Sequence, residues 1–403
     1  MAADEVWVTG LGLLTAAGDG AAATWERVLR GESTAVAEHE PGPVHLACRV
    51  AAFDQARIGA LRARKPDRSA ELAVLAAREA VVDAGWDTAR WDGARVGVVV
   101  GTSSGNTHTH EVQHRALLDG GPRDMSPFAV SSTLGNSVAA QLSMELAAKG
   151  GCLTVNTACA SGATALGVAL DLLRAHRCDV VIAGGTDAPL TPYYIAGFDR
   201  VGALSRRFAD PAGASRPFDA DRDGFVLAEG AGMLVLERAA DARARGARPR
   251  ARLLGYGAAS DAHHVAQPCP AGSGLTAAIR AALRDAQVTA GEVGYVNAHA
   301  TGTPLGDRIE AAALAELLPH RPAVSSTKAV TGHPQGAAGA IEAALTVLAV
   351  ETGTVPANVN LDRPDVGVDL DLLTRSRTGP VPLALSTSVG FGGHNAALAV
   401  AAP

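Results

Sequence analysis

Lysines, aromatic residues and long apolar runs are scarce in this 403-residue chain, and each scarcity excludes a class of function. The basic residues include only three lysines, Lys65, Lys149 and Lys328, so each lysine is conspicuous. Aromatic residues make up 4% of the chain, and no long basic run with interleaved aromatics offers a surface for nucleic acid. No run reaches the roughly 18 apolar residues of a membrane-spanning helix.

The cysteines lack the spacing of a disulfide framework or of a CxxC site. They are odd in number and widely spread: Cys48, Cys152, Cys159, Cys178 and Cys269. This usage is typical of reduced thiols in the cytosol. The N-terminal stretch "VWVTGLGLLTAAG" precedes the first positive side chain, Arg27, and glycines interrupt it, which is unlike a signal peptide. We therefore expect a cytoplasmic protein.

Short runs rich in Val, Ile and Leu alternate with longer helical patterns, which predicts an α/β chain with buried strands between helices. These runs lie at 6–10, 95–101, 153–157, 179–185, 293–298, 323–327 and 383–388. A content of 47% hydrophobic and 19% charged residues is typical of a compact soluble enzyme.

The chain also repeats one plan. "REAVVDAG" followed by "VGVVVGTSSG" parallels "RAALRDAQ" followed by "VGYVNAHATG", and "LTVNTACASGATALGVALDLL" parallels "AVSSTKAVTGHPQGAAGAIEAALTVL". The repeat predicts two halves, 1–240 and 241–403, that meet at the charged segment 238–250. Matching strand-to-helix turns can converge on one site at the carboxyl ends of the strands.

Cys159 lies in the first of these turns, just before a predicted helix. A helix N-terminus favours negative charge, so the pKa of a cysteine there can fall from about 8.5 to between roughly 3.5 and 7.5. A small buried core cysteine is the alternative. The second half supplies His299, Lys328 and His333 at its matching turns, so one junctional site would use all four residues. A buried lysine needs a carboxylate, and Glu310 is the candidate.

At these segments the sequence resembles a known family. "TACASG", "NAHATGTP" with "GDRIEA", "SSTKAVTGH" with "GAAG", and "GFGGHNA" are similar to the Cys-His-His motifs of β-ketoacyl synthases, the condensing enzymes of the thiolase fold. "GFDRVGALSRR" and "RPFDADRDGFVLAEGAGMLVLE" resemble the middle section of that family. The resemblance implies a five-layered α-β-α-β-α core formed by the two halves.

The resemblance also implies roles for the chemical residues. Cys159 would take an acyl chain as a thioester. His299 and His333 would bind the carbonyl of an incoming malonyl thioester and stabilise the enolate formed on decarboxylation. Lys328, paired with Glu310, would hold the charge network around His333.

Further roles follow from the same resemblance for residues beside the nucleophile. The backbone N–H groups of Cys159 and Phe391 would form an oxyanion hole, and Phe391 would gate the site. Thr301 and Thr303 would contact the phosphopantetheine arm, and Gly392 and Gly393 would bind substrate. No metal or other cofactor is implied, because the substrates arrive on the phosphopantetheine of an acyl carrier protein.

Some positions depart from the commonest family pattern and bear on the pathway. Ala300 replaces the usual glycine, and Pro334 and Gln335 follow His333, where fatty acid synthases usually carry apolar residues. This mixture favours the catalytic ketosynthase of a type II polyketide synthase, with a fatty acid elongating ketosynthase as the alternative. The partner would be a second copy or a chain-length-factor-like subunit, and a non-elongating subunit is a further alternative that Cys159 argues against.

Other patterns invite competing interpretations. "NTHTHEVQH" offers His108, His110 and His114 to a metal, but no matching cysteine or carboxylate set accompanies them, which favours a polar loop. His263 and His264 are expected in a loop near the substrate entrance. "VTGLGLLTAAG" resembles a dinucleotide-binding turn, yet Thr15 occupies the third glycine position, so a tight turn after the first strand is the simpler interpretation.

Two further enzyme classes are considered on the same residues. In a cysteine hydrolase water would resolve the thioester on Cys159, but two histidines and a lysine fit condensation better. A thiolase would need a second cysteine near "GFGG", where this chain carries His394.

Overall fold

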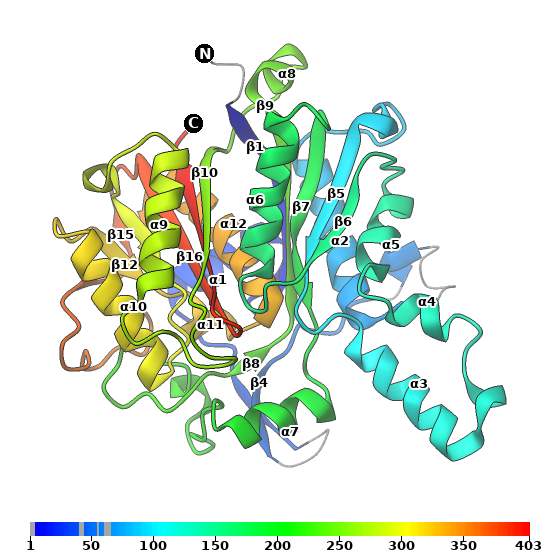
Figure 1. The fold of residues 1–403 in the computed structure, drawn as a ribbon, viewed down its shortest axis with the longest axis horizontal. Coiled ribbons are helices and arrows are strands. Elements are labelled where there is room, and N and C mark those ends of the chain that lie inside the picture. Colours follow the sequence, from blue (N-terminus) through cyan, green and yellow to red (C-terminus); the bar gives the residue numbers. More distant parts are fainter. Residues whose placement is uncertain (1–4, 40–43, 55, 60–65) are drawn as a thin grey trace.

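A twelve-stranded sheet runs through the computed structural model, which describes residues 5–39, 44–54, 56–59 and 66–403 (Figure 1). Its first half follows the order β1, β9, β7, β5, β6 outward from the centre, and its second half follows β10, β17, β16, β11, β12, β14. The halves meet where β1 pairs with β10 over only three residues, Val6 to Val8. The same plan is therefore built twice, as the repeat predicts.

The strands of the first half are β1 (Val6–Thr15), β5 (Val96–Gly101), β6 (Cys152–Val155), β7 (Val180–Asp187) and β9 (Gly230–Arg238). Those of the second are β10 (Ala251–Ser260), β11 (Tyr295–Asn297), β12 (Ala323–Ser325), β14 (Asp371–Leu372), β16 (Leu383–Gly390) and β17 (His394–Ala401). Short strands complete the set: β2 (Gly18–Asp19), β3 (Val36–Glu38), β4 (His45–Cys48), β8 (Leu227–Ala228), β13 (Thr354–Val355) and β15 (Arg377–Thr378).

Two helices, α6 (Ser161–Arg174) and α12 (Ala338–Thr352), lie between the two half-sheets. They pack on each other, and each contacts strands of both halves. α12 has no polar face because it is buried on all sides, apart from its last turn. The outer faces carry α2 (Arg68–Asp83) and α5 (Ser137–Glu145) on the first half and α9 (Ser273–Asp285) and α10 (Pro304–Leu317) on the second. This order confirms the five-layered core.

The remaining helices are α1 (Ala21–Arg30), α3 (Thr107–Gly120), α4 (Ala129–Thr133), α7 (Pro192–Val201), α8 (Ala239–Ala244) and α11 (Lys328–Thr331). α3 and α4 extend away from the layered body, whereas α11 lies inside it (Figure 1). None of the helices in the described ranges has the length and apolar character needed to cross a membrane.

The tight turn predicted after the first strand lies within "VTGLGLLTAAG", but later than its first two glycines: β1 continues to Thr15, and Ala16 and Ala17 form the turn to β2. The glycines of β1 serve packing: a Cβ on Gly10 would lie 2.2 Å from the carbonyl oxygen of Ala80, and one on Gly12 would lie 2.0 Å from that of Ala76. They let α2 lie directly on the strand. The predicted runs match β5, β6, β7, β11, β12 and β16, but they omit β9, β10 and β17. Of these, β10 and β17 are rich in Gly and Ala.

Candidate active site

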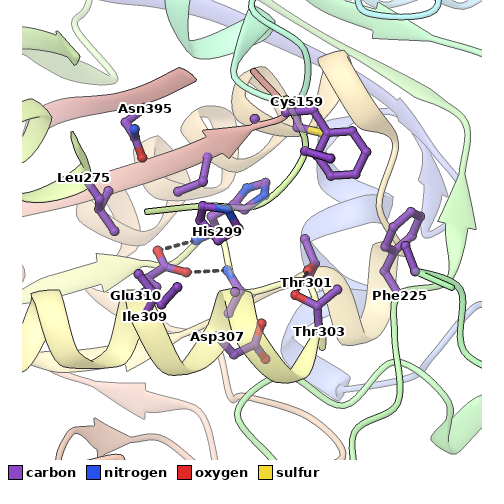
Figure 2. Close-up of a pocket in the computed structure, with 18 of the residues that line it drawn as sticks. Cys159, Phe225, Leu275, His299, Thr301, Thr303, Asp307, Ile309, Glu310 and Asn395 are labelled. Carbon is purple, nitrogen blue, oxygen red and sulfur yellow. Dashed lines mark hydrogen bonds between the residues drawn. The ribbon is translucent and has the colours of Figure 1, made fainter. Parts of the chain in front are cut away.

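A cavity of about 110 Å³ lies where the strand ends of the two halves meet, and it brings the sequence-predicted residues together. Cys159 reaches it from the first half, and His299 and Glu310 reach it from the second (Figure 2). His333 of the second half also lines it. Three phenylalanines, Phe198, Phe225 and Phe391, also line it. Lys328 lies behind this lining, fully buried.

The nucleophile candidate lies in a strained turn between β6 and α6. Ala158 has a φ of 52°, in the left-handed region that non-glycine residues seldom adopt. The Ser161 side chain holds the turn, because its hydroxyl accepts from the Thr157 N–H at 2.9 Å and donates to the Ala158 carbonyl at 2.6 Å. α6 begins at Ser161, so Cys159 stands at the helix N-terminus, as predicted.

The Cys159 thiol lies between two side chains of the second half. Its Sγ is 3.2 Å from Nε2 of His333, and it donates to Oε1 of Gln335 at 3.4 Å. Burial raises the pKa of the thiol to about 12, although the charge of Lys328 and the backbone N–H of Phe391 act in the opposite direction. The pKa of this thiol is therefore raised, and not lowered as its place at a helix N-terminus predicts, because burial removes the water that would stabilise the thiolate.

The end of β16 packs directly on the cysteine turn. A Cβ on Gly390 would lie 2.6 Å from the Thr157 carbonyl oxygen and 3.0 Å from the Cys159 nitrogen. This close approach brings the backbone N–H of Phe391 to the cysteine sulfur. The Phe391 ring is 38% exposed and lies 6.2 Å from the ring of Phe198, at the wall of the cavity. Its roles in an oxyanion hole and as a gate stay predictions.

The two histidines face each other edge to face. Their ring centroids are 5.3 Å apart at an interplanar angle of 83°. Burial lowers the pKa of both rings well below the usual 6.5, and the charge of Lys328 lowers them further. Both imidazoles are therefore neutral at pH 7, and a neutral imidazole donates one hydrogen bond without delivering a second proton.

The prediction that Lys328 pairs with Glu310 is wrong. Lys328 forms an ion pair with Glu342 of α12, and both side chains are buried. Glu310 instead accepts from the backbone N–H of His299 at 3.0 Å and of Ala300 at 2.7 Å, the two dashed lines of Figure 2. It also accepts from the hydroxyl of Thr387 at 2.7 Å. Its lone pairs are thus used in holding the loop that carries His299.

The threonine and glycine candidates lie at different places. Thr301 and Thr303 both line the cavity, and their hydroxyl oxygens are 3.2 Å apart. Gly392 and Gly393 form the turn between β16 and β17, with φ of 83° and 75°, and they are not among the residues that line the cavity. Their contribution to the geometry is the turn itself, which only glycine adopts without strain.

Sequence reasoning missed a buried carboxylate that joins the two halves. Asp187, at the end of β7, accepts from the Thr102 and Ser104 hydroxyls at 2.6 Å each. It also accepts from the backbone N–H of Gly336 at 2.6 Å, which holds the turn after His333. The one sequence feature that could have indicated Asp187 is its place at the end of the strand sequence "DVVIAGGTD". Glu342 was missed because a helical glutamate is usually exposed.

The histidine cluster does not form the predicted polar loop. His108, His110 and His114 lie on α3, and the rings of the last two stack at 6.4 Å. Across the described ranges, no group of three metal-ligating side chains is arranged to hold an ion. His263 and His264 do lie in an exposed loop, beside cavity-lining residues such as Asp261, in agreement with the predicted position near the entrance.

Comparison with known proteins gives consistent matches over the whole chain. The β-ketoacyl synthase N-terminal domain matches residues 3–242 and its C-terminal domain matches residues 250–362. A 3-oxoacyl-[acyl-carrier-protein] synthase 2 of Staphylococcus aureus (strain COL) is 40% identical over 404 residues, which cover 98% of this chain and 97% of that protein.

Two solved structures extend the comparison. The ishigamide ketosynthase/chain length factor is 32% identical, with a TM-score of 0.91 over 99% of both chains. A type II polyketide synthase structure, in which an acyl carrier protein is in complex with its ketosynthase bound to the hexaketide, is 30% identical, with a TM-score of 0.90 over 99% of both chains.

Proposed function

The chain belongs to the β-ketoacyl synthase family, and from this membership we propose that it extends a Cys159-bound acyl chain with malonyl-[acyl carrier protein]. It has the thiolase-like fold of that family and is a 3-oxoacyl-[acyl-carrier-protein] synthase, an acyltransferase that condenses two acyl groups. The observation that carries the residue roles is the convergence of Cys159, His299 and His333 on one cavity.

In the first step the Cys159 sulfur attacks the thioester carbonyl of an acyl-[acyl carrier protein]. The new bond joins Sγ to the carbonyl carbon, the pantetheine sulfur leaves, and it takes the proton of the thiol. The backbone N–H groups of Cys159 and Phe391 would hold the oxyanion. Donors that are preorganised in this way contribute about 3 to 4 kcal/mol each to such a step.

In the second step a malonyl thioester loses its carboxylate as CO2. The electron pair of the broken bond moves to the thioester oxygen, and the neutral rings of His299 and His333 are suited to donate hydrogen bonds to that enolate. The enolate carbon then attacks the acyl carbonyl, and the Cys159 sulfur leaves. The product is a 3-oxoacyl chain, two carbons longer, on the carrier protein.

Sequence identity to known proteins bears on whether the chain acts in a fatty acid or a polyketide pathway. The 40% identity with the 3-oxoacyl-[acyl-carrier-protein] synthase 2 supports a fatty acid elongating ketosynthase better than the sequence-predicted polyketide ketosynthase. The type II polyketide structure is 30% identical. The residue that favours the polyketide alternative is Gln335, whose amide is a polar group in the cavity beside the nucleophile.

A second ketosynthase-like chain is the proposed partner, as a homodimer or a chain-length-factor heterodimer. β6 ends the first half-sheet, and its Leu153 is 42% exposed. The neighbouring helices α3 to α5 expose Val112, Phe128, Val130 and Met144. Apolar exposure beside an edge strand supports an interface there. The molar mass of the purified chain in solution, measured by light scattering, tests it.

The reaction is tested by intact-mass analysis with acyl- and malonyl-[acyl carrier protein]. We expect an acyl adduct on the wild-type protein and none on Cys159→Ala. His299→Ala should keep the adduct and lose CO2 release, because the ring that contacts the sulfur is that of His333. Absence of any adduct on the wild type, with several acyl donors, would contradict the proposed function.

A further inference from the structure

A buried amide stands beside Cys159, in a cavity that both apolar and polar side chains line. Gln335 lines the cavity and is 2% exposed. Its Oε1 accepts the Cys159 S–H at 3.4 Å. Its Nε2 is buried and has no hydrogen-bond acceptor among the described residues. A buried N–H group without a partner costs free energy, so this donor is suited to bind an acceptor from a molecule outside the chain.

The backbone holds this amide in place at some cost. Gln335 has a φ of 47°, in the left-handed region, where a glycine would be less strained. Asp187 clamps the next residue through the Gly336 N–H at 2.6 Å, and the Ala337 N–H closes a tight turn on the Pro334 carbonyl at 3.0 Å. Strain that the surrounding structure maintains in this way is characteristic of functional positions.

Acylation of Cys159 changes the surroundings of the amide. The thioester has no S–H, so Oε1 loses its donor, while Nε2 still lacks an acceptor. Each covalent bond of the acyl chain spans about 1.5 Å, so atoms roughly 3 to 4 Å from Sγ lie level with its second and third carbons. The thioester oxygen itself would face the backbone N–H groups of Cys159 and Phe391. In the 3-oxoacyl product of the proposed condensation, the next oxygen along the chain lies on the third carbon.

We infer that Gln335 donates through Nε2 to an oxygen on the third carbon of the Cys159-bound chain. The enzyme thus selects 3-oxoacyl or 3-hydroxyacyl primers over fully reduced ones, a preference that fits the polyketide alternative and not a fatty acid elongating ketosynthase. A reduced primer places a methylene against the amide and leaves the buried donor unpaired. An apolar side chain at this position would carry no such penalty. This inference rests on the proposed function, because it concerns the chain that Cys159 carries.

The test compares two primers that differ only at the third carbon. Butanoyl- and 3-oxobutanoyl-[acyl carrier protein] compete for the full-length protein with malonyl-[acyl carrier protein], and the products are counted by mass. In Gln335→Met, which keeps the volume and removes the donor, the preference for the 3-oxo primer should fall about 10-fold or more. Gln141→Met, a buried glutamine of α5 outside this cavity, is the matched control and should leave the preference unchanged.

The outcomes separate this inference from the proposed function. An equal primer preference in the wild type and Gln335→Met would overturn the role of the amide, while condensation itself persisted. If Gln335→Met fails to fold, the wild-type competition alone decides: a 10-fold preference for butanoyl would overturn the inference, and a preference for 3-oxobutanoyl would support it. Absence of an adduct with either primer would instead refute the proposed function.

Discussion

The ion pair between Lys328 and Glu342 offers a direct test of the corrected site geometry. Lys328 is 0% exposed and Glu342 is 2% exposed, so removal of either partner leaves a buried charge without compensation. Such a loss costs about 3 to 5 kcal/mol, whereas replacement of both partners by apolar residues of similar volume is often neutral. We therefore expect Lys328→Met and Glu342→Met each to lower the free energy of unfolding by about 3 kcal/mol or more, and the double variant to recover most of the loss.

Denaturant unfolding of the single and double variants measures this coupling energy. A parallel cycle of Lys328→Met with Glu310→Gln is the control, because the Glu310 oxygens accept hydrogen bonds from the His299 loop and from Thr387. We expect a coupling of about 3 kcal/mol or more in the first cycle and about 1 kcal/mol or less in the second. A larger coupling between Lys328 and Glu310 would refute the reasoning and restore the sequence-based pairing.

Three further predictions follow from the cysteine turn and its supports. Because the pKa of the Cys159 thiol is raised to about 12, the rate at which iodoacetamide alkylates Cys159 should rise about tenfold per pH unit between pH 7 and 10. A rate that reaches a plateau below pH 8 would contradict this raised pKa. In Gly390→Ala the new methyl group would lie 2.6 Å from the Thr157 carbonyl oxygen. The rate of Cys159 acylation should therefore fall at least about 10-fold, and the free energy of unfolding should fall by about 1 to 3 kcal/mol. Gly379→Ala, where a methyl group meets no atom within 4 Å, is the control and should show neither effect. Asp187→Ala removes the carboxylate that accepts from the Gly336 N–H, so it should lower the free energy of unfolding by about 3 kcal/mol in denaturant unfolding. It should also weaken the primer preference that we assign to Gln335, because the turn that carries Gln335 is no longer held. An unchanged primer preference would contradict the role of Asp187 in holding that turn.

Much of the candidate site could be predicted from the repeat. Matching turns in two similar halves placed Cys159 opposite His299, Lys328 and His333, and the structure brings these residues around one cavity or directly behind it. The strands could be predicted from short segments as well, because an apolar run of four to eight residues indicates a strand buried between helices. β10 and β17 were not predicted, because Gly and Ala carry little strand signal.

The carboxylate partner of Lys328 could not be chosen in the same way. Glu310 and Glu342 both lie on helices near the lysine in sequence, and nothing local distinguishes them. The choice depends on how α12 inserts between the two half-sheets and on the backbone N–H groups that occupy Glu310 first. Side-chain partners across separate elements follow from packing, which no single segment encodes.

The sequence by itself determined the duplicated α/β plan, the cysteine at a helix N-terminus and the two histidines of the second half, because these features follow from short-range pattern and repetition. Only the tertiary structure decided the ionisation of the site and the partners of its buried groups. Burial raises the pKa of Cys159 against the effect of its helix, and it leaves Nε2 of Gln335 without an acceptor among the described residues. Both outcomes depend on how much water the folded chain excludes, which is a property of the assembled layers and not of any one segment.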